Sequence, residues 1–249
     1  MEDHEAPLIE HLIELRKRLL LAVVGTLVIF LALVPFAKSL YTILAGPLLQ
    51  ALPEGGHMIA TQVISPFLTP MKLALLASLI MAAPWWLYQM WLFIAPGLYA
   101  HERTLFTGVM VSSVFFFFLG VLFAYKVVFP LAFRFLLHAA PEGVEVMTDI
   151  NEYLGFVMSM FLAFGLAFEV PIIVVLLVKL GIVQVAQLKK ARPYIIIGAF
   201  FLGAILTPPD VISQLLLAFP LWFLFEIGLF VAGYLNKKAA LASKEDTSL

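Results

Sequence analysis

Three glutamates in this sequence lie beside basic residues or within an apolar segment, and they are the first candidates for a binding function. Glu14 lies in "PLIEHLIELRKRLL" (7–20), close to basic residues, and Glu102 lies beside an arginine in "FIAPGLYAHER" (93–103). A carboxylate binds a guanidinium group through paired hydrogen bonds, so these two glutamates can bind a cationic peptide. No metal ion or other cofactor is expected at these positions.

Both glutamates also have plainer explanations, which the residues leave open. Glu14 and Arg18 are four residues apart and can form a surface pair worth about 0.2–0.5 kcal/mol. Glu102 precedes an apolar stretch, where it can stabilise the positive end of a helix dipole. Because the apolar residues around Glu14 recur at helical spacing, we expect an interfacial helix that continues into the first membrane span.

Glu169 is the only ionisable residue in "LAFGLAFEVPIIVVLL" (162–177). Charged side chains at such depth in an apolar segment face a bundle interior or a water-filled cavity, and they are functional by default. The alternative is a protonated acid that donates a hydrogen bond to a carbonyl. Pro171 fits both explanations, because a proline frees a backbone carbonyl one turn earlier. We expect a functional Glu169 and leave its charge state open.

Polar residues also occur between the last two apolar stretches, in "LTPPDVISQ" (206–214). Thr207 and Gln214 can hold another helix through hydrogen bonds worth about 1 kcal/mol each. The alternative is a plain turn in which Asp210 caps the helix that follows.

The composition is that of an integral membrane protein. Of the 249 residues, 63% are hydrophobic and 12% are charged, and the mean hydropathy is +1.05. A soluble domain carries about 25% charged residues, so this chain has too few polar side chains to cover a surface in water. The net charge of -1 argues against a nucleic-acid partner.

The enzyme classes find little support in the sequence. The histidines all lie outside the apolar stretches, and the chain contains no H-E-x-x-H, no G-x-S-x-G and no nucleotide-binding loop. These absences disfavour an intramembrane protease. A permease that uses Glu169 as a proton carrier is the other alternative, although proteins of that class usually contain internal repeats and this sequence has none.

Six apolar stretches predict an all-α membrane protein with six transmembrane helices, because lipid offers no hydrogen bonds to an open backbone. Of the 15 basic residues, all but Lys38, Lys72, Lys126 and Arg134 fall on one side, which places both termini in the cytoplasm. We expect a single membrane domain at 1–235, followed by a flexible cytoplasmic tail at 236–249. The expected spans are about 19–37, 73–95, 104–128, 152–178, 193–206 and 211–235.

The connections between these spans are expected to differ in kind. The outer loop at about 38–72 contains prolines and glycines, and it predicts a structured periplasmic cap with a short helix over 39–52. A second outer loop is expected at about 129–151. The fifth stretch, 193–206, corresponds to about 21 Å of helix against about 30 Å of hydrocarbon, so we expect a short fifth span. The sixth span is also expected to be short.

Five motifs occur in order along the chain. They are "HLIELRKRL" (11–19), "SPFLTPMK" (65–72), "FIAPGLYAHER" (93–103), "FLAFGLAFEVP" (161–171) and "RPYIIIGAFFLGAILTPPDVISQ" (192–214). Together they resemble the TatC family, the core receptor subunit of the twin-arginine protein translocase, in its proteobacterial form. The resemblance covers about residues 8–235, and five motifs at matching spacing make it specific.

The resemblance implies a glove-like, concave bundle in the bacterial inner membrane. It implies binding of twin-arginine signal peptides of folded precursor proteins at the cytoplasmic face, and export that uses the proton-motive force. It also implies single-span TatB-like and TatA-like partners and self-association in a multi-copy receptor complex. The signal-peptide-binding positions that it implies are Glu14, Glu102, Arg16, Arg18 and Arg103.

The resemblance also implies roles outside the signal-peptide site. Glu169 matches the family's intramembrane glutamate, which lines the concave surface, and Pro47 matches a functional position of the periplasmic cap. Thr207 and Gln214 match the docking site for a partner's transmembrane helix. Asp210 matches a family residue to which we assign no definite role.

Overall fold

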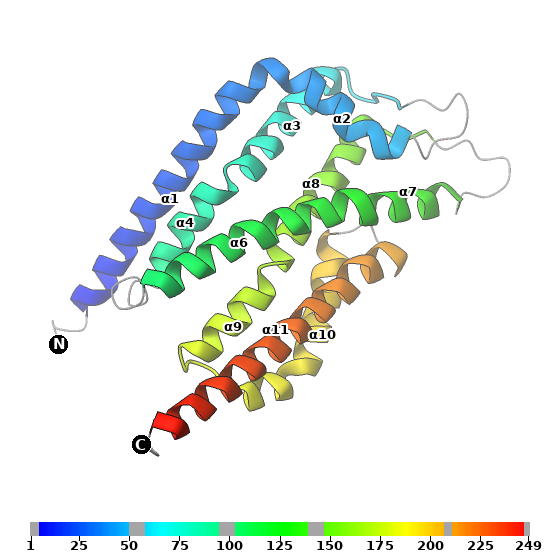
Figure 1. Ribbon diagram of the computed structural model, residues 1–249. Coiled ribbons are helices and arrows are strands. Elements are labelled where there is room, and N and C mark those ends of the chain that lie inside the picture. Colours follow the sequence, from blue (N-terminus) through cyan, green and yellow to red (C-terminus); the bar gives the residue numbers. More distant parts are fainter. Residues whose placement is uncertain (1–4, 50–57, 95–102, 139–146, 207–210, 247–249) are drawn as a thin grey trace. The chain divides into compact units, whose positions relative to one another are not determined.

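The computed structural model describes residues 5–49, 58–94, 103–138, 147–206 and 211–246, and almost all of these are helical (Figure 1). The predicted all-α class is therefore confirmed. The elements are α1 (Glu5–Leu33), the 3-10 helix η1 (Val34–Phe36), α2 (Ala37–Leu49), α3 (Ser65–Met81), α4 (Ala83–Ile94), α6 (Arg103–Phe123), the π-helix η2 (Ala124–Val128), α7 (Phe129–His138), α8 (Ile150–Ala167), α9 (Val170–Lys179), α10 (Val185–Leu206) and α11 (Val211–Asp246).

The chain divides into two compact units, and each is described by itself. The first comprises Met1–Gly46, Met58–Phe115 and Thr148–Leu154, and the second comprises Pro47–His57, Phe116–Met147 and Gly155–Leu249. The expectation of one membrane domain over 1–235 stays a prediction.

In the first unit, α1 packs against α3 and α4 (Figure 1). The indole Nε1 of Trp85 donates a hydrogen bond to the backbone carbonyl of Leu21, at 2.8 Å. Gly25, one turn further along α1, permits this approach, because a Cβ atom there would collide with the indole ring. A second indole, that of the buried Trp91, donates to the hydroxyl of Ser113 at 2.7 Å and links α4 to α6.

In the second unit, α11 packs against α9 and α10 (Figure 1). Val174, Phe225 and Ala232 form a buried cluster between these helices. A second group of aromatic rings joins α7 to α8, where Phe129 contacts Phe161 edge to face with the ring centroids 4.9 Å apart. Both groups are apolar, as expected for helices that bury side chains against each other rather than against lipid.

Four helical segments of the described chain are long and apolar enough to cross a membrane. α3 and α4 pass the same test as a pair bent by 54°, which raises the number to five if the pair forms one span. α10 is not among them, since basic residues occupy its first turns. The six-span count and the cytoplasmic position of both termini therefore stay predictions. The four segments are Ile9–Gly46, Phe106–Phe135, Ile150–Lys179 and Val211–Lys237.

The predicted second span, 73–95, starts too late and is not straight. α3 begins at Ser65, so Pro66 and Pro70 lie in a helix and not in the outer loop. Pro66 lies in the first turn, where proline is tolerated because the first N–H groups of a helix have no partner within it, whereas Pro70 lies inside the helix. The bend falls between α3 and α4, where Pro84 has no N–H to continue the helical hydrogen bonds across Ala82.

The predicted outer loop at 129–151 is wrong in its first part. The π-helix η2 leads from α6 directly into α7, so the helical path continues to His138. Pro130 has no N–H to donate one turn back, and a π-helical turn accommodates such a gap. The helix continues because it has a core to cover, where the buried Phe133 packs edge-on against Phe156.

The last two helices are longer than their apolar stretches. α10 begins at Val185, so the boundary at Pro193 marks a change of polarity and not the start of a helix. The expectation of a short sixth span is wrong, since α11 runs from Val211 to Asp246. The predicted flexible tail is helical as far as Asp246, in keeping with the alanines, leucines and lysines that follow residue 236.

Part of the predicted periplasmic cap is visible. α2 confirms the helix expected from residue 39, up to Leu49. The backbone of Ile59 pairs with residues 148 and 150 through two hydrogen bonds of 3.0 and 2.9 Å. Asp149 strengthens this junction, because its carboxylate accepts hydrogen bonds from the backbone N–H and the hydroxyl of Thr61, at 2.8 and 2.7 Å. The hydroxyl of Tyr153 then donates to the carbonyl of Leu44 and ties α8 to α2.

Replacing Gly25 with alanine tests the contact between α1 and α4. The added methyl group collides with the Trp85 indole, and we expect the variant to lose about 1–3 kcal/mol of stability. Gly108→Ala is the matched control, because a Cβ there meets nothing within 4 Å and gains the same helix propensity. Thermal unfolding of the purified variants in detergent measures both. Equal midpoints for the two variants would contradict the contact.

The cap junction is expected to weaken in acid. The hydrogen bonds from Thr61 lower the pKa of Asp149 from 3.8 to about 2. A lowered folded-state pKa contributes stability that is present above pH 3.8 and is lost as the pH falls toward 2. The protection of the Ile59 and Ile150 amides against hydrogen exchange, relative to the intrinsic rate at each pH, should therefore fall over this range in the wild type. In Asp149→Asn the protection should be low throughout, and high protection that does not change with pH in that variant would refute the role of the carboxylate.

Candidate functional site

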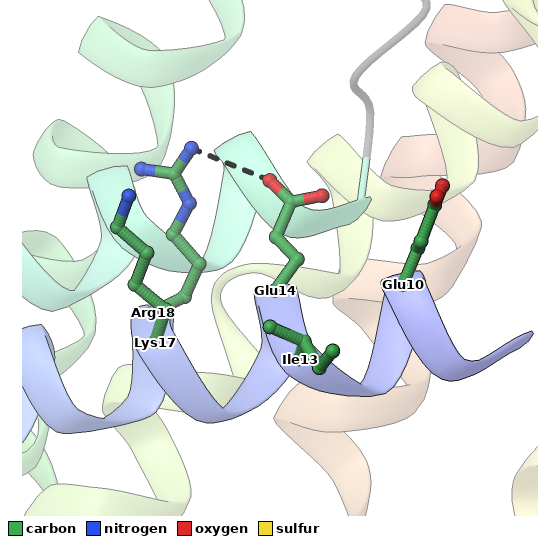
Figure 2. A pocket seen from close by; sticks show the side chains of 5 residues that line it. All are labelled: Glu10, Ile13, Glu14, Lys17 and Arg18. Atoms are coloured by element: carbon green, nitrogen blue, oxygen red, sulfur yellow. Dashed lines mark hydrogen bonds and ion pairs between the residues drawn. The ribbon is translucent and has the colours of Figure 1, made fainter. Parts of the chain in front are cut away.

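A pocket on the first helix surrounds one of the predicted glutamates. It has a volume of about 320 Å³ and is lined by Glu10, Ile13, Glu14, Lys17 and Arg18. All five come from one stretch of α1, residues 10–18, so the helix itself positions them (Figure 2). Figure 2 shows the Arg18 guanidinium reaching back toward the Glu14 carboxylate, with Glu10 one turn earlier on the same side of the helix.

Arg18 divides its guanidinium group between two acceptors. One terminal nitrogen lies 3.3 Å from Glu14 Oε1, which confirms the predicted pairing of these residues on one helix face. The other terminal nitrogen donates to Gln89 Oε1 of α4, at 3.2 Å. The side chains of Arg18 and Glu14 are 26% and 36% exposed, so the pair is accessible from outside the protein. The structure thus brings Glu14 and Arg18 together and adds Gln89, which the sequence did not single out.

A second, apolar pocket adjoins this pair, between α1 and α4. It has a volume of about 280 Å³, and Arg18 and Gln89 are its polar residues. The Trp85–Leu21 hydrogen bond holds the two helices together beside it, and the His11 and Phe93 rings stack at 4.3 Å. Its lining residues are Leu15, Arg18, Leu19, Ala22, Trp86, Gln89, Met90 and Phe93.

The other predicted signal-peptide residues are placed in part. Arg16 is exposed on α1. Arg103 is the first residue of α6, and its side chain lies outside the described part of the structure. Glu102 lies outside the described residues altogether. The pairing of Glu14 with Glu102 across one site stays a prediction.

Glu169 lies in the second unit, at a break in the predicted fourth span. α8 ends at Ala167, and Glu169 is the residue that precedes α9. Pro171 explains the break, because it has no N–H to donate to the carbonyl of Ala167. Glu169 is 3% exposed, so it faces neither bulk solvent nor open lipid in this chain. Its predicted position along a concave surface stays a prediction.

α11 supports the helix that begins at this break. Gly228 lies against Pro171 and Val174, and a Cβ atom there would be 2.8 Å from the Cα of Pro171. The close approach therefore requires glycine. Because Pro171 fixes where α9 starts, the contact with α11 also fixes the backbone next to Glu169.

The predicted docking residues lie near the α10–α11 connection. Gln214 donates a hydrogen bond from Nε2 to the backbone carbonyl of Phe200, at 2.9 Å, and so links α11 to α10. Thr207 and Asp210 lie outside the described residues. Pro47 lies within α2, and its side chain is outside the described part.

A second acid in an apolar run was missed by the sequence reasoning. Glu226 of α11 forms an ion pair with Arg192 of α10, with 2.7 Å between Oε2 and the guanidinium nitrogen. The argument that singled out Glu169 applies equally to Glu226, which stands in "LWFLFEIGLF" (221–230). The pair gives Arg192 a partner at the polar end of α10.

Comparison with known proteins assigns the family. The family model described as "Sec-independent protein translocase protein (TatC)" matches residues 10–220. The chain belongs to the TatC family. The Sec-independent protein translocase protein TatC of Escherichia coli K12 is 56% identical over 234 residues, which cover 94% of this chain and 90% of that protein. The TatC protein of Azotobacter chroococcum mcd 1 is 52% identical over 246 residues, 99% of this chain and 96% of that one.

A solved structure agrees with this assignment. The crystal structure of the twin arginine translocase receptor TatC superimposes with a TM-score of 0.82 at 39% sequence identity, over 90% of this chain and 98% of that chain. As a TatC protein, the chain is a membrane-embedded component of the Sec-independent protein translocase. It is a transport protein and not an enzyme, in agreement with the sequence prediction.

Replacing Gly228 with alanine tests the support beneath Glu169. The new methyl group lies 2.8 Å from the backbone of Pro171 and 3.1 Å from the Val174 side chain, so α9 and α11 must separate. We expect a loss of about 1–3 kcal/mol in stability, measured by thermal unfolding in detergent. Gly233→Ala on the same helix is the control, because a Cβ there meets Val185 at an ordinary 3.9 Å. A stable Gly228→Ala protein would contradict the contact.

Proposed function

We propose that this TatC-family chain recognises the twin-arginine signal peptides of folded precursor proteins. In this proposal Glu14 and Glu102 bind the two arginine side chains of the peptide. The observation that carries it is the Glu14 pocket, in which an accessible carboxylate already binds a guanidinium group at 3.3 Å. A carboxylate that binds the chain's own arginine has the geometry to bind an arginine from a peptide.

The basic residues Arg16, Arg18 and Arg103 belong to the same proposed site. Arg18 supports this assignment through its contact with Glu14, and Arg16 through its exposure on the same helix. The apolar part of the peptide would follow the pocket between α1 and α4, since Leu15, Leu19 and Met90 line it. A peptide whose charged residues are followed by apolar residues would place the charged part in the Glu14 pocket and the apolar part in the pocket between α1 and α4.

Later steps are assigned to other residues. We propose that Glu169 serves the signal peptide or a partner helix deeper in the membrane, and that Pro47 belongs to the functional part of the periplasmic cap. Thr207 and Gln214 are proposed to dock the transmembrane helix of a TatB-like or TatA-like partner, and Asp210 lies beside them in sequence. The link from Gln214 to Phe200 supports a polar end for these helices.

The proposed setting is the bacterial inner membrane, with six spans and both termini in the cytoplasm. The clustering of basic residues in the segments 16–18, 189–192 and 237–244 supports this orientation. In that membrane the chain would self-associate in a multi-copy receptor complex. It would scaffold its single-span partners for export driven by the proton-motive force.

Photo-crosslinking of a twin-arginine peptide to the purified chain tests the proposal. We expect strong labelling with the twin-arginine peptide and weak labelling with a twin-lysine peptide, because lysine cannot bind a carboxylate through two parallel hydrogen bonds. Glu14→Gln and Glu102→Gln should each lower the labelling by about tenfold. Glu152→Gln, which removes an exposed carboxylate from α8, is the control. Equal labelling of both peptides by the wild type and the Glu14 variant would overturn the assignment.

A further inference from the structure

We propose that Arg18 occupies the position of a peptide arginine at Glu14 when no peptide is bound, and that Gln89 determines how strongly Arg18 binds Glu14. The inference rests on the proposed function, since it assumes that Glu14 receives an arginine side chain. It changes the role of Arg18 from a peptide-binding residue to a positioning residue. It also makes Gln89, on α4, a determinant of affinity for the signal peptide.

The geometry of the Glu14–Arg18 pair is that of a weak contact that another arginine can replace. A single guanidinium nitrogen approaches a single carboxylate oxygen, at 3.3 Å. Charge-assisted hydrogen bonds of this kind are usually about 2.7–2.9 Å long, and the stable form is the paired one. The accessible, single contact can therefore be replaced by an incoming arginine that binds Glu14 through two hydrogen bonds.

Gln89 explains why the pairing is incomplete. Its side chain is 3% exposed, and a buried amide needs hydrogen-bond partners. The 3.2 Å bond from Arg18 to Gln89 Oε1 draws the guanidinium toward α4, so that only one terminal nitrogen is left for Glu14. The arginine is thus divided between Glu14, whose accessible carboxylate a peptide arginine can take over, and Gln89, whose amide is buried beside the apolar pocket.

Gln89 also gives Arg18 a place to stay after displacement. Arg18 borders the apolar pocket formed with Leu15, Leu19 and Met90, where a guanidinium without a partner is costly. With Gln89 present, a displaced Arg18 keeps one hydrogen bond. Peptide binding then removes Glu14 as a partner of Arg18 but does not leave the guanidinium group without a hydrogen bond.

Three variants of the full-length chain separate this role from a merely structural one. Arg18→Gln exposes Glu14 and should tighten twin-arginine peptide binding about two- to fivefold. Gln89→Glu attracts Arg18 away from Glu14 and should tighten binding by a similar factor. Gln89→Leu removes the second partner, which leaves Arg18 on Glu14, and should weaken binding about two- to fivefold.

The measurement is the Kd of a fluorescent twin-arginine peptide for the purified protein in lipid nanodiscs, with monodispersity checked for every variant. Opposite shifts for Gln89→Glu and Gln89→Leu support the inference, and this pair decides the outcome if Arg18→Gln fails to fold. The inference is overturned if the two Gln89 variants shift the Kd in the same direction, or if Arg18→Gln binds the peptide more weakly. If the binding still depends on Glu14 in that case, the proposed function stands. A wild-type Kd that Glu14→Gln does not change overturns both.

Discussion

Backbone hydrogen bonding in lipid is the constraint on which the rest of this structure depends. Hydrocarbon offers no partner to an open N–H or C=O group, so each one must be satisfied within the protein. Proline removes a donor, and the interruptions described above lie just before prolines. The bend before Pro84, the π-helical turn before Pro130 and the break before Pro171 all re-route the helix where its hydrogen-bond ladder lacks a donor. The irregular points of the chain are therefore set by a few residues.

The same constraint gives Glu169 its place. The break at Pro171 ends α8 and starts α9, and the first N–H groups of a helix have no helical acceptor. A helix N-terminus favours an acidic side chain, so this is a position where an acid in an apolar span is less costly than elsewhere. Gly228 then allows α11 to press against Pro171 and keep the break in place. Pro171 and Gly228 thus fix the backbone that carries the buried Glu169, whose side chain makes no capping hydrogen bond to α9.

The sequence predicted the helical class because apolar runs of this length have no other stable form in lipid. It misplaced several helix ends, because hydropathy reports which residues tolerate lipid, whereas a helix continues for as long as its hydrogen bonds and packing favour it. α10 therefore begins at Val185, before the basic residues that precede its apolar stretch, and α11 extends into the tail as far as Asp246. The Glu14–Arg18 pair could be predicted because its spacing is local. Gln89 could not, since it stands 71 residues from Arg18 and no periodicity links them.

Glu14 and Glu169 depend on different packing contacts, so a substitution can disturb the surroundings of one without those of the other. Glu14 meets Arg18 within α1, and Arg18 in turn meets Gln89 on α4. The hydrogen bond of Trp85 to α1, at the surface that Gly25 leaves open, holds α4 in place. Glu169 depends on a proline break and on α11, which lies far along the chain. A change that disturbs the α9–α11 contact therefore leaves the guanidinium-binding geometry of α1 in place. A variant of that kind that still binds peptide but does not transport would assign Glu169 to a step after recognition.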